Sequence, residues 1–185
     1  VGRHEKKMGL RGSTTTELMF DDCHVPASNI IGGEAMIGKG FKTAMRVLDK
    51  GRLTLAAASV GMAQKALELA VSYAKERVQF GRPIGHFQLI QGMLAQMASE
   101  VFAGRQMVYR TAWEKDQGNQ IRMEAAMTKL FCTEMLGRVA DLSLQVHGGM
   151  GYMKEFPIER IYRDGRVVRI YEGTSEIQKI VIARE

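Results

Sequence analysis

The sequence predicts a mainly α fold, a four-helix up-down bundle preceded by a short β segment. Three observations support this prediction. The chain has only three prolines, at positions 26, 83 and 157, which leaves long stretches free to form helices. Within those stretches apolar residues recur at helix-compatible spacing, and glycines interrupt the chain where each periodic stretch stops.

The first segment of the chain has the pattern of a β-strand. From Gly12 to Pro26, three threonines are followed by Leu18 and Phe20, which alternate with polar neighbours. A turn at Pro26 and a linker at Gly32–Gly33 follow. We therefore expect residues 1–33 to be the end of a β-domain with its linker, and residues 34–185 to form the helical bundle.

Five helices are expected after this lead-in. The apolar periodicity places three long ones at about 40–78, 87–116 and 121–147. A short helix over 157–164 starts at Pro157, which suits a first helical turn. The last helix follows Thr174, with Ser175 and Gln178 predicted to form a capping box at its start.

Composition places the chain among ordinary globular proteins. Its 185 residues are 45% hydrophobic and 25% charged, which excludes wholesale disorder and suits about one domain. The net charge of +6 favours an anionic partner, but the basic residues are dispersed, so an ordinary surface with a mild basic excess is an equally good interpretation. A nucleic-acid binder would need a clustered basic face, and the sequence has none.

Cysteine usage and the ends of the chain restrict its setting. Cys23 and Cys132 have no spacing typical of a disulfide framework or a metal site, so we expect a reducing compartment and no metal. No apolar run is long enough for a membrane span, and no signal peptide is recognisable. Because the chain begins at Val1, we expect it to be a piece of a longer protein.

Residues 171–178 contain a candidate catalytic carboxylate. Glu172 lies in a loop beside Gly173, directly before a helix whose free N–H groups could face a ligand. A desolvated Glu172 could act as a general base. The alternative is a solvated carboxylate that merely favours the helix N-terminus.

Two further segments have both a structural and a functional interpretation. At the end of the first long helix, Arg77 suits the helix dipole, and Phe80 could stack on a ring or close the bundle, closure being favoured. Later, Gly148, Gly149 and Gly151 are more glycines than one helix cap requires, so the backbone could approach a ligand there or form a tight turn. His147 is expected to be a bonded structural histidine.

Taken together, these segments closely resemble the carboxy-terminal half of the acyl-CoA dehydrogenase family. The similarity extends over essentially the whole chain. The matching stretches are residues 7–13, 22–26, 38–41, 49–52, 77–81, 87–89, 145–151, 162–164 and 170–178. The sequences of residues 49–52 and 171–176 look closest to those of short- or medium-chain, straight-chain members.

The resemblance implies FAD-dependent α,β-dehydrogenation of an acyl-CoA thioester to the trans-2-enoyl-CoA, as in fatty acid β-oxidation. Glu172 matches the glutamate that removes the pro-R α-proton, and its backbone N–H matches a donor to the thioester oxygen. Some relatives place the base on the long helix, just before the arginine that matches Arg52; here that position is Gly51.

The resemblance also assigns binding residues. Those that match substrate contacts are Asp49, Arg52 and Gly173. Those that match FAD contacts are Arg77, Phe80, Gln88, Gln145, Val146, His147, Gly148, Gly149, Thr174, Ser175 and Glu176. In the family several of these reach the FAD of a neighbouring subunit, so a homo-oligomer, a dimer or tetramer, is expected.

Electrons would pass to an electron-transfer flavoprotein, in the bacterial cytoplasm or the mitochondrial matrix. Two alternatives stay open: an acyl-CoA oxidase-like flavoprotein, and a non-catalytic helical module that assembles oligomers. Because the resemblance covers only half of the family's length, we expect this chain by itself to be inactive and to bind FAD weakly or not at all.

Overall fold

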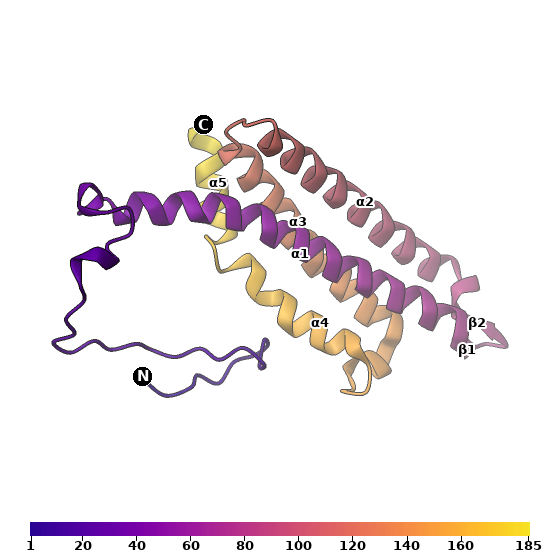
Figure 1. Ribbon diagram of the computed structural model, residues 1–185. Helices are drawn as coiled ribbons and strands as arrows, with labels where there is room; N and C mark the ends of the chain where they lie inside the picture. Colours follow the sequence, from indigo (N-terminus) through magenta and orange to yellow (C-terminus); the bar gives the residue numbers. More distant parts are fainter.

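The computed structural model describes the backbone of residues 1–185 and all side chains except those of Arg46 and Asp49. Three long helices run alternately up and down: α1 (Gly40–Glu76), α2 (Gln88–Asp116) and α3 (Arg122–His147). Two shorter helices, α4 (Pro157–Gly165) and α5 (Ser175–Arg184), follow one another along α3 in the place of a fourth helix (Figure 1). The predicted helical fold class is confirmed.

Small side chains bring α1 and α3 together. Along α1 the alanines at 56, 63, 66, 70 and 74 recur every three, four or seven residues and are almost fully buried. This stripe faces α3, the helix with which α1 makes its most extensive contact, and the partner side chains are larger, including Met135, Leu136 and Val139. Ser143 of α3 donates a 2.7 Å hydrogen bond to the carbonyl oxygen of Ala66, which the close approach of the two helices permits.

Short elements connect the helices. A hairpin of β1 (Val78–Gln79) and β2 (Arg82–Pro83) separates α1 from α2, with Phe80 and Gly81 in the left-handed region at its tip. The 3-10 turns are η1 (Ala27–Asn29), η2 (Glu34–Met36), η3 (Ile84–His86), η4 (Gly148–Tyr152) and η5 (Arg166–Arg169). Gly118, with φ +84°, lies just past the end of α2, as its sequence position predicts.

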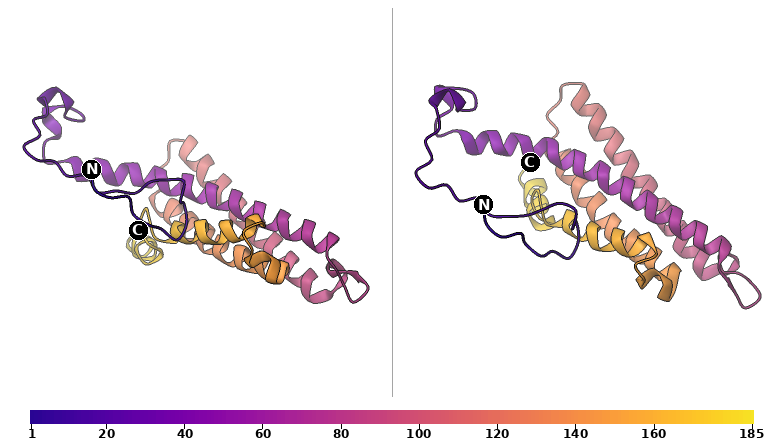
Figure 2. Two further views of the ribbon diagram at one scale, coloured as in Figure 1. Left: turned by 90° about the horizontal axis from the view of Figure 1, so that it is seen from below. Right: turned by 60° about the horizontal axis from the view of Figure 1, so that its bottom comes forward.

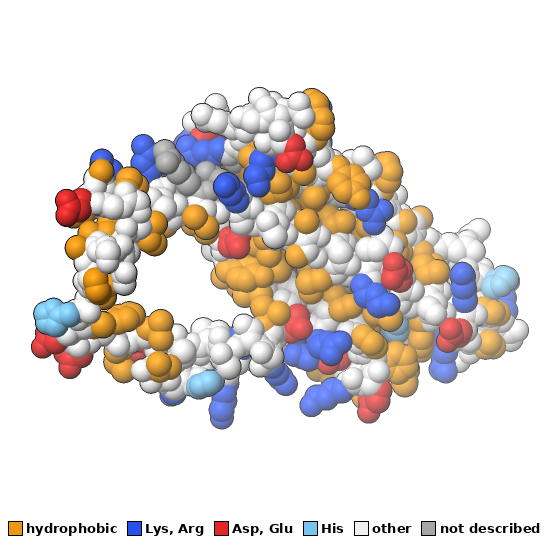
Figure 3. All heavy atoms as spheres, viewed as in Figure 1, with side chains coloured by type: hydrophobic (Ala, Val, Ile, Leu, Met, Phe, Trp, Pro, Cys, Tyr) orange, Lys and Arg blue, Asp and Glu red, His pale blue; other side chains and the backbone are white. Residues whose placement is uncertain are grey.

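The predicted strand between residues 12 and 26 is not formed as a regular strand. Two backbone hydrogen bonds, from Gly2 N to Glu17 O and from Glu5 N to Thr15 O, join the two arms of the segment. An isolated pair of extended arms is marginally stable without further strands beside it. The segment extends away from the bundle, and open space separates much of it from the helices (Figures 2 and 3).

The same segment is fixed to the bundle at one place. Leu10 N donates to Asp164 Oδ1 at 2.7 Å, and Arg163 of α4 donates to the carbonyl oxygen of Met8 at 2.9 Å. A Cβ at Gly9 would lie 2.7 Å from the carbonyl oxygen of Arg163, so only glycine permits this approach. Over the described residues, none of the helices has both the length and the apolar character needed to cross a membrane.

Candidate active site

Glu172 stands in a strained loop between η5 and α5. Its φ of +55° lies in the left-handed region, which costs a non-glycine residue on the order of 1 kcal/mol, and Gly173 follows with φ +89°. Backbone strain of this kind persists only where the surroundings hold it, and it is concentrated at functional sites.

Two buried side chains hold this loop. Gln178 of α5 donates through Nε2 to the carbonyl oxygens of Glu172 at 3.2 Å and Gly173 at 2.9 Å. Lys129 of α3 donates through Nζ to the same Gly173 oxygen at 2.8 Å. A Cβ at Gly173 would lie 2.7 Å from Gln178 Nε2, so glycine is required there for space as well as for φ.

The Glu172 side chain is directed at α1. A Cβ at Gly51 would lie 2.7 Å from Glu172 Oε2, so the absence of a side chain at position 51 makes room for the carboxylate. Oε2 is buried and has no hydrogen-bond partner among the described residues. Arg52, next to Gly51, is also buried, with 6% of its surface exposed. The loop thus directs one carboxylate oxygen without a hydrogen-bond partner among the described residues at Gly51, the position where some members of the family that this sequence resembles place their base.

The charges around Glu172 are unusual for a protein interior. Burial lowers the pKa of Lys129 from its ordinary 10.5, the neighbouring Arg52 lowers it further, and Glu172, Glu134 and Glu176 counteract this. Burial also raises the pKa of Tyr171, and the Glu172 carboxylate adds to that effect. Glu172 therefore lies in a partly desolvated cluster with two cations beside it.

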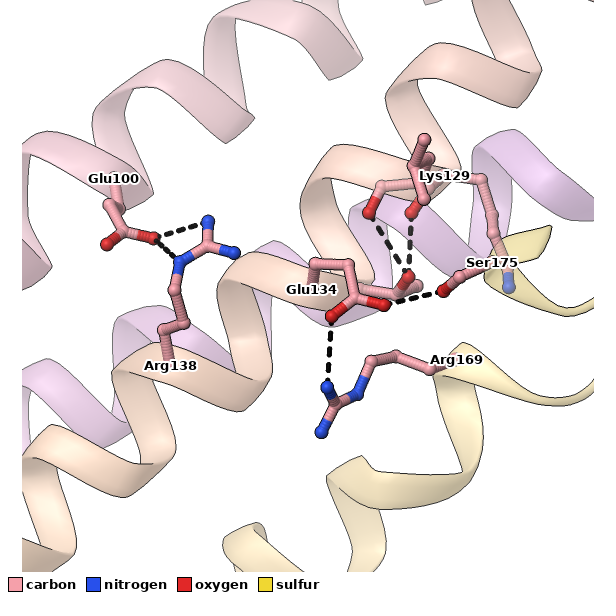
Figure 4. A network of polar contacts seen from close by, with 8 residues as sticks. Glu100, Lys129, Glu134, Arg138, Arg169 and Ser175 are labelled. Atoms are coloured by element: carbon pink, nitrogen blue, oxygen red, sulfur yellow. Dashed lines mark hydrogen bonds and ion pairs between the residues drawn. The ribbon is translucent and has the colours of Figure 1, made fainter. Parts of the chain in front are cut away.

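A separate polar network fixes the start of α5 (Figure 4). Ser175 donates to Glu134 Oε1 at 2.6 Å, and Arg169 donates to Glu134 Oε2 at 2.9 Å. Burial alone would raise the pKa of Glu134, but these hydrogen bonds and the Arg169 charge lower it below 4.5 overall. The network ties α5 and η5 to α3.

The predicted capping box at Ser175 and Gln178 is wrong. The N-cap is Thr174, whose hydroxyl accepts from Ile177 N at 3.4 Å, because Ser175 is bonded to Glu134 and Gln178 is turned toward the Glu172 loop. Glu176 stands exposed in the first turn, where its own backbone N–H and the Thr174 hydroxyl lower its pKa.

Arg77, Phe80 and Gln88 lie at the hairpin end of the bundle, and all three are exposed. Phe80 is 93% exposed, so the favoured interpretation that it closes the bundle is wrong. Its left-handed backbone at the hairpin tip turns the ring outward, where it meets Phe87 edge-on at 6.0 Å. An exposed aromatic ring next to cationic side chains fits a stacking contact with an anionic ligand.

Residues 145–149 lie at the same end of the bundle. Gln145, Gly148 and Gly149 are exposed, and nothing lies within 4 Å of a Cβ built at either glycine. Val146 and His147 are buried; His147 Nδ1 donates to the Ser143 carbonyl oxygen at 2.7 Å, and its ring stacks on Tyr73 at 4.5 Å. His147 is therefore structural, as expected, and a ligand can reach it only through its backbone.

The predicted residues thus form two groups. Glu172 lies against Gly51 of α1, and Gly173 and residues 174–176 follow it into α5, whereas Arg77, Phe80, Gln88 and residues 145–149 lie at the hairpin end. The 26 positions from Gly51 to Arg77 amount to about 39 Å at 1.5 Å per residue. The side chain of Asp49, a predicted substrate contact, is outside the described residues.

Sequence reasoning missed Lys129, Gln178 and Glu134. Lys129 is a charged residue on the buried face of α3, and that interruption of an apolar stripe was the available signal. The sequence pattern predicts Gln178 only as a helix-capping residue. The contact from Lys129 to Gly173 joins positions 44 apart, so no local pattern reveals it.

The fold and the loop geometry define a helical domain with one aimed carboxylate, and the comparisons agree with the resemblance. The model of the acyl-CoA dehydrogenase carboxy-terminal domain matches residues 38–185. The chain belongs to the acyl-CoA dehydrogenase family.

Three relatives illustrate the match. The acryloyl-CoA reductase (NADH) of Anaerotignum propionicum is 50% identical over the whole chain, which covers 46% of that protein. The human mitochondrial short-chain specific acyl-CoA dehydrogenase is 46% identical over 99% of the chain, covering 44% of that protein. The structure of butyryl-CoA dehydrogenase from Megasphaera elsdenii superposes with a TM-score of 0.94 at 44% identity, over 99% of this chain and 47% of that one. The chain therefore spans about half the length of these relatives.

Proposed function

We propose that this chain supplies the catalytic base of a FAD-dependent enzyme that converts an acyl-CoA thioester to its trans-2-enoyl-CoA. The observation that carries this proposal is the Glu172 loop, whose buried, unpaired Oε2 is held against the space left by Gly51. Family membership supports the reaction class, and the names of the relatives support a CoA thioester as substrate.

In this mechanism Glu172 removes the α-proton of the thioester. The substrate replaces water around the carboxylate, which makes the anion a stronger base. The proton passes from Cα to a Glu172 oxygen, the electron pair of the broken Cα–H bond forms the Cα–Cβ double bond, and the hydride that leaves Cβ with its electron pair would be taken up by the bound flavin. The N–H of Glu172 would donate to the thioester oxygen, where negative charge develops. Gly173, without a side chain, would let the thioester lie against the loop.

The flavin, when bound, supplies the hydride acceptor. The exposed residues of the hairpin end fit such a group: Phe80 offers a free ring face, Arg77 a cation for a pyrophosphate, and Gly148 and Gly149 open backbone. The Glu172 group would face a second flavin, with residues 174–176 beside it. The separation of about 39 Å along α1 favours an assembly in which each flavin contacts two copies of the chain.

Relatives named as reductases make the reverse direction, saturation of an enoyl-CoA, the second candidate. The same base then returns a proton to Cα. A structure solved in a study of the electron transferring flavoprotein of Acidaminococcus fermentans matches with a TM-score of 0.94, and another relative is a subunit of the caffeyl-CoA reductase–Etf complex of Acetobacterium woodii. We therefore propose such a flavoprotein as the electron partner, ahead of direct transfer to oxygen; oxygen consumption distinguishes the two.

The test replaces Glu172 with Gln in the flavin-loaded full-length protein that contains this chain. We expect flavin content to be unchanged, while exchange of the α-protons of butyryl-CoA with D2O and flavin reduction both fall by at least about a thousandfold, because Glu172 is the base that the proposal assigns to this step. Glu155→Gln, at an exposed carboxylate, is the matched control and should be silent. Retained exchange in Glu172→Gln would refute the proposal and favour a non-catalytic module.

A further inference from the structure

Lys129 is a lysine in a position where lysine is rare. It lies near the start of α3, and none of its surface is exposed, although its neighbours on that face are the small and apolar side chains of the core. A buried ammonium costs folding free energy, so its presence requires a specific role. The role is visible in the hydrogen bond that its side chain donates to the carbonyl oxygen of Gly173.

This hydrogen bond joins α3 to the loop that carries Glu172. Figure 4 shows the Lys129 side chain extending from α3 toward the segment that leads into α5, beside Ser175. The residue whose oxygen it holds directly follows Glu172, and both have positive φ. The Gly173 carbonyl belongs to the peptide group between Gly173 and Thr174, so the Lys129 bond limits the rotation of Gly173 that would carry Glu172 out of position. The network of Glu134, Arg169 and Ser175 anchors α5, and its hydrogen bonds do not involve the carbonyl oxygens of Glu172 and Gly173.

The charge of Lys129 acts on the same loop. Charged groups face its ammonium from each neighbouring element: Arg52 of α1, Glu134 of α3, Glu172 of the loop and Glu176 of α5. Among the carboxylates, Glu172 exerts the largest effect on Lys129. The ammonium of Lys129 and the carboxylate of Glu172 carry opposite charges and therefore attract each other across the loop.

We propose that Lys129 is a positioning residue for the reaction: its buried ammonium holds the Gly173 carbonyl so that Glu172 is aimed at the α-carbon, and its positive charge attracts the Glu172 carboxylate. This inference rests on the proposed function, because it assigns Lys129 a role through Glu172. Lys129 itself does not touch the reacting atoms.

The fold does not require this bond. Gly173 O also accepts from Gln178, so replacing Lys129 leaves no orphaned carbonyl, and a methionine has a similar length without the charge. Lys129→Met is therefore expected to fold. Lys129→Gln keeps a donor but removes the charge, and it separates the two parts of the role. Thr111→Val, which removes a buried 2.8 Å hydrogen bond to Thr128, is the control for a purely structural loss.

The experiment measures α-proton exchange of butyryl-CoA in D2O with the flavin-loaded full-length protein, together with flavin content and the urea midpoint. In Lys129→Met we expect exchange to fall roughly ten- to hundredfold with flavin content unchanged, because the Gly173 carbonyl loses the donor that positions the loop. Lys129→Gln keeps a donor and should recover part of this loss, a rescue that a purely structural role does not predict. Thr111→Val should lower the urea midpoint and leave exchange within twofold of the parent.

Three results would overturn the inference: exchange within twofold of the parent in Lys129→Met, exchange in Lys129→Gln no higher than in Lys129→Met, or an equal loss of exchange in Thr111→Val. If Lys129→Met does not fold, Lys129→Gln decides alone, and exchange within twofold of the parent in that variant overturns the inference. The Glu172→Gln variant separates this inference from the proposed function. If Glu172→Gln retains α-proton exchange, the proposed function is contradicted. If Glu172→Gln is inactive while the Lys129 variants exchange as the parent does, only the role of Lys129 is contradicted.

Discussion

At the scale of single residues, two glycines and a lysine decide what Glu172 can do. Gly173 permits the second positive φ in succession, Gly51 leaves space for the carboxylate, and Lys129 holds the carbonyl that follows it. None of these residues carries out chemistry. Together they set the conformation of the loop and leave the carboxylate room against α1, and this orients the Glu172 side chain.

Gly51→Ala should separate stability from activity. A methyl at 2.7 Å from Oε2 displaces the flexible end of Glu172, while alanine in the helix stabilises α1 by about 0.5–1 kcal/mol. Gly61→Ala on the same helix has nothing within 4 Å of its Cβ and is the matched control. We expect both variants to gain similar unfolding free energy in urea, and only Gly51→Ala to lose α-proton exchange, by roughly tenfold or more. Unaltered exchange in Gly51→Ala would show that the carboxylate is not fixed against α1.

At the scale of elements, α5 keeps its place through polar contacts more than through apolar burial. Of its ten residues only Ser175 and Gln178 are buried, and both make hydrogen bonds with other elements. The Glu134 carboxylate joins Ser175 of α5 to Arg169 of η5. The loop that holds Glu172 is therefore fixed at both ends.

Glu134→Gln should reveal this anchor through pH. The folded-state pKa of Glu134 lies below its ordinary 4.5, so its ionisation stabilises the fold above pH 4.5, and this contribution is lost as pH falls through the folded-state value. At pH 7 we expect the variant to be less stable by about 1 kcal/mol, because the carboxylate is partly exposed. Urea unfolding of both proteins should show the difference shrinking below pH 4.5; a difference independent of pH would contradict the ionic anchor.

At the scale of the whole molecule, the two groups of predicted contacts lie at opposite ends of α1. One copy of the chain presents Glu172, the proposed base, against the first half of α1 and the exposed ring of Phe80 past its last residue, about 39 Å away. In the proposed enzyme α1 would serve as a spacer between two half-sites. This arrangement suits an oligomer in which the end of one copy completes the site of another.

The chain purified by itself should contain far less than one flavin per chain and should show no turnover, because each half-site lacks its complement. Absorbance of bound flavin after gel filtration, followed by addition of butyryl-CoA, measures this. The full-length protein treated in the same way is the control. Stoichiometric flavin that bleaches on addition of butyryl-CoA would show that one copy of this chain completes the site.

The sequence by itself determined the helices and the family. Apolar periodicity and sparse prolines placed α1, α2, α3 and α4 within two residues of their observed ends, because burial of one helix face imposes that spacing. Tertiary structure decided the rest. Phe80 is exposed because a hairpin tip turns it outward, and Ser175 and Gln178 leave the capping box because Glu134 and the Glu172 loop provide better partners. That Gly51 and Lys129 meet the same loop follows from packing α1 and α3 side by side, which brings together residues that no local pattern connects.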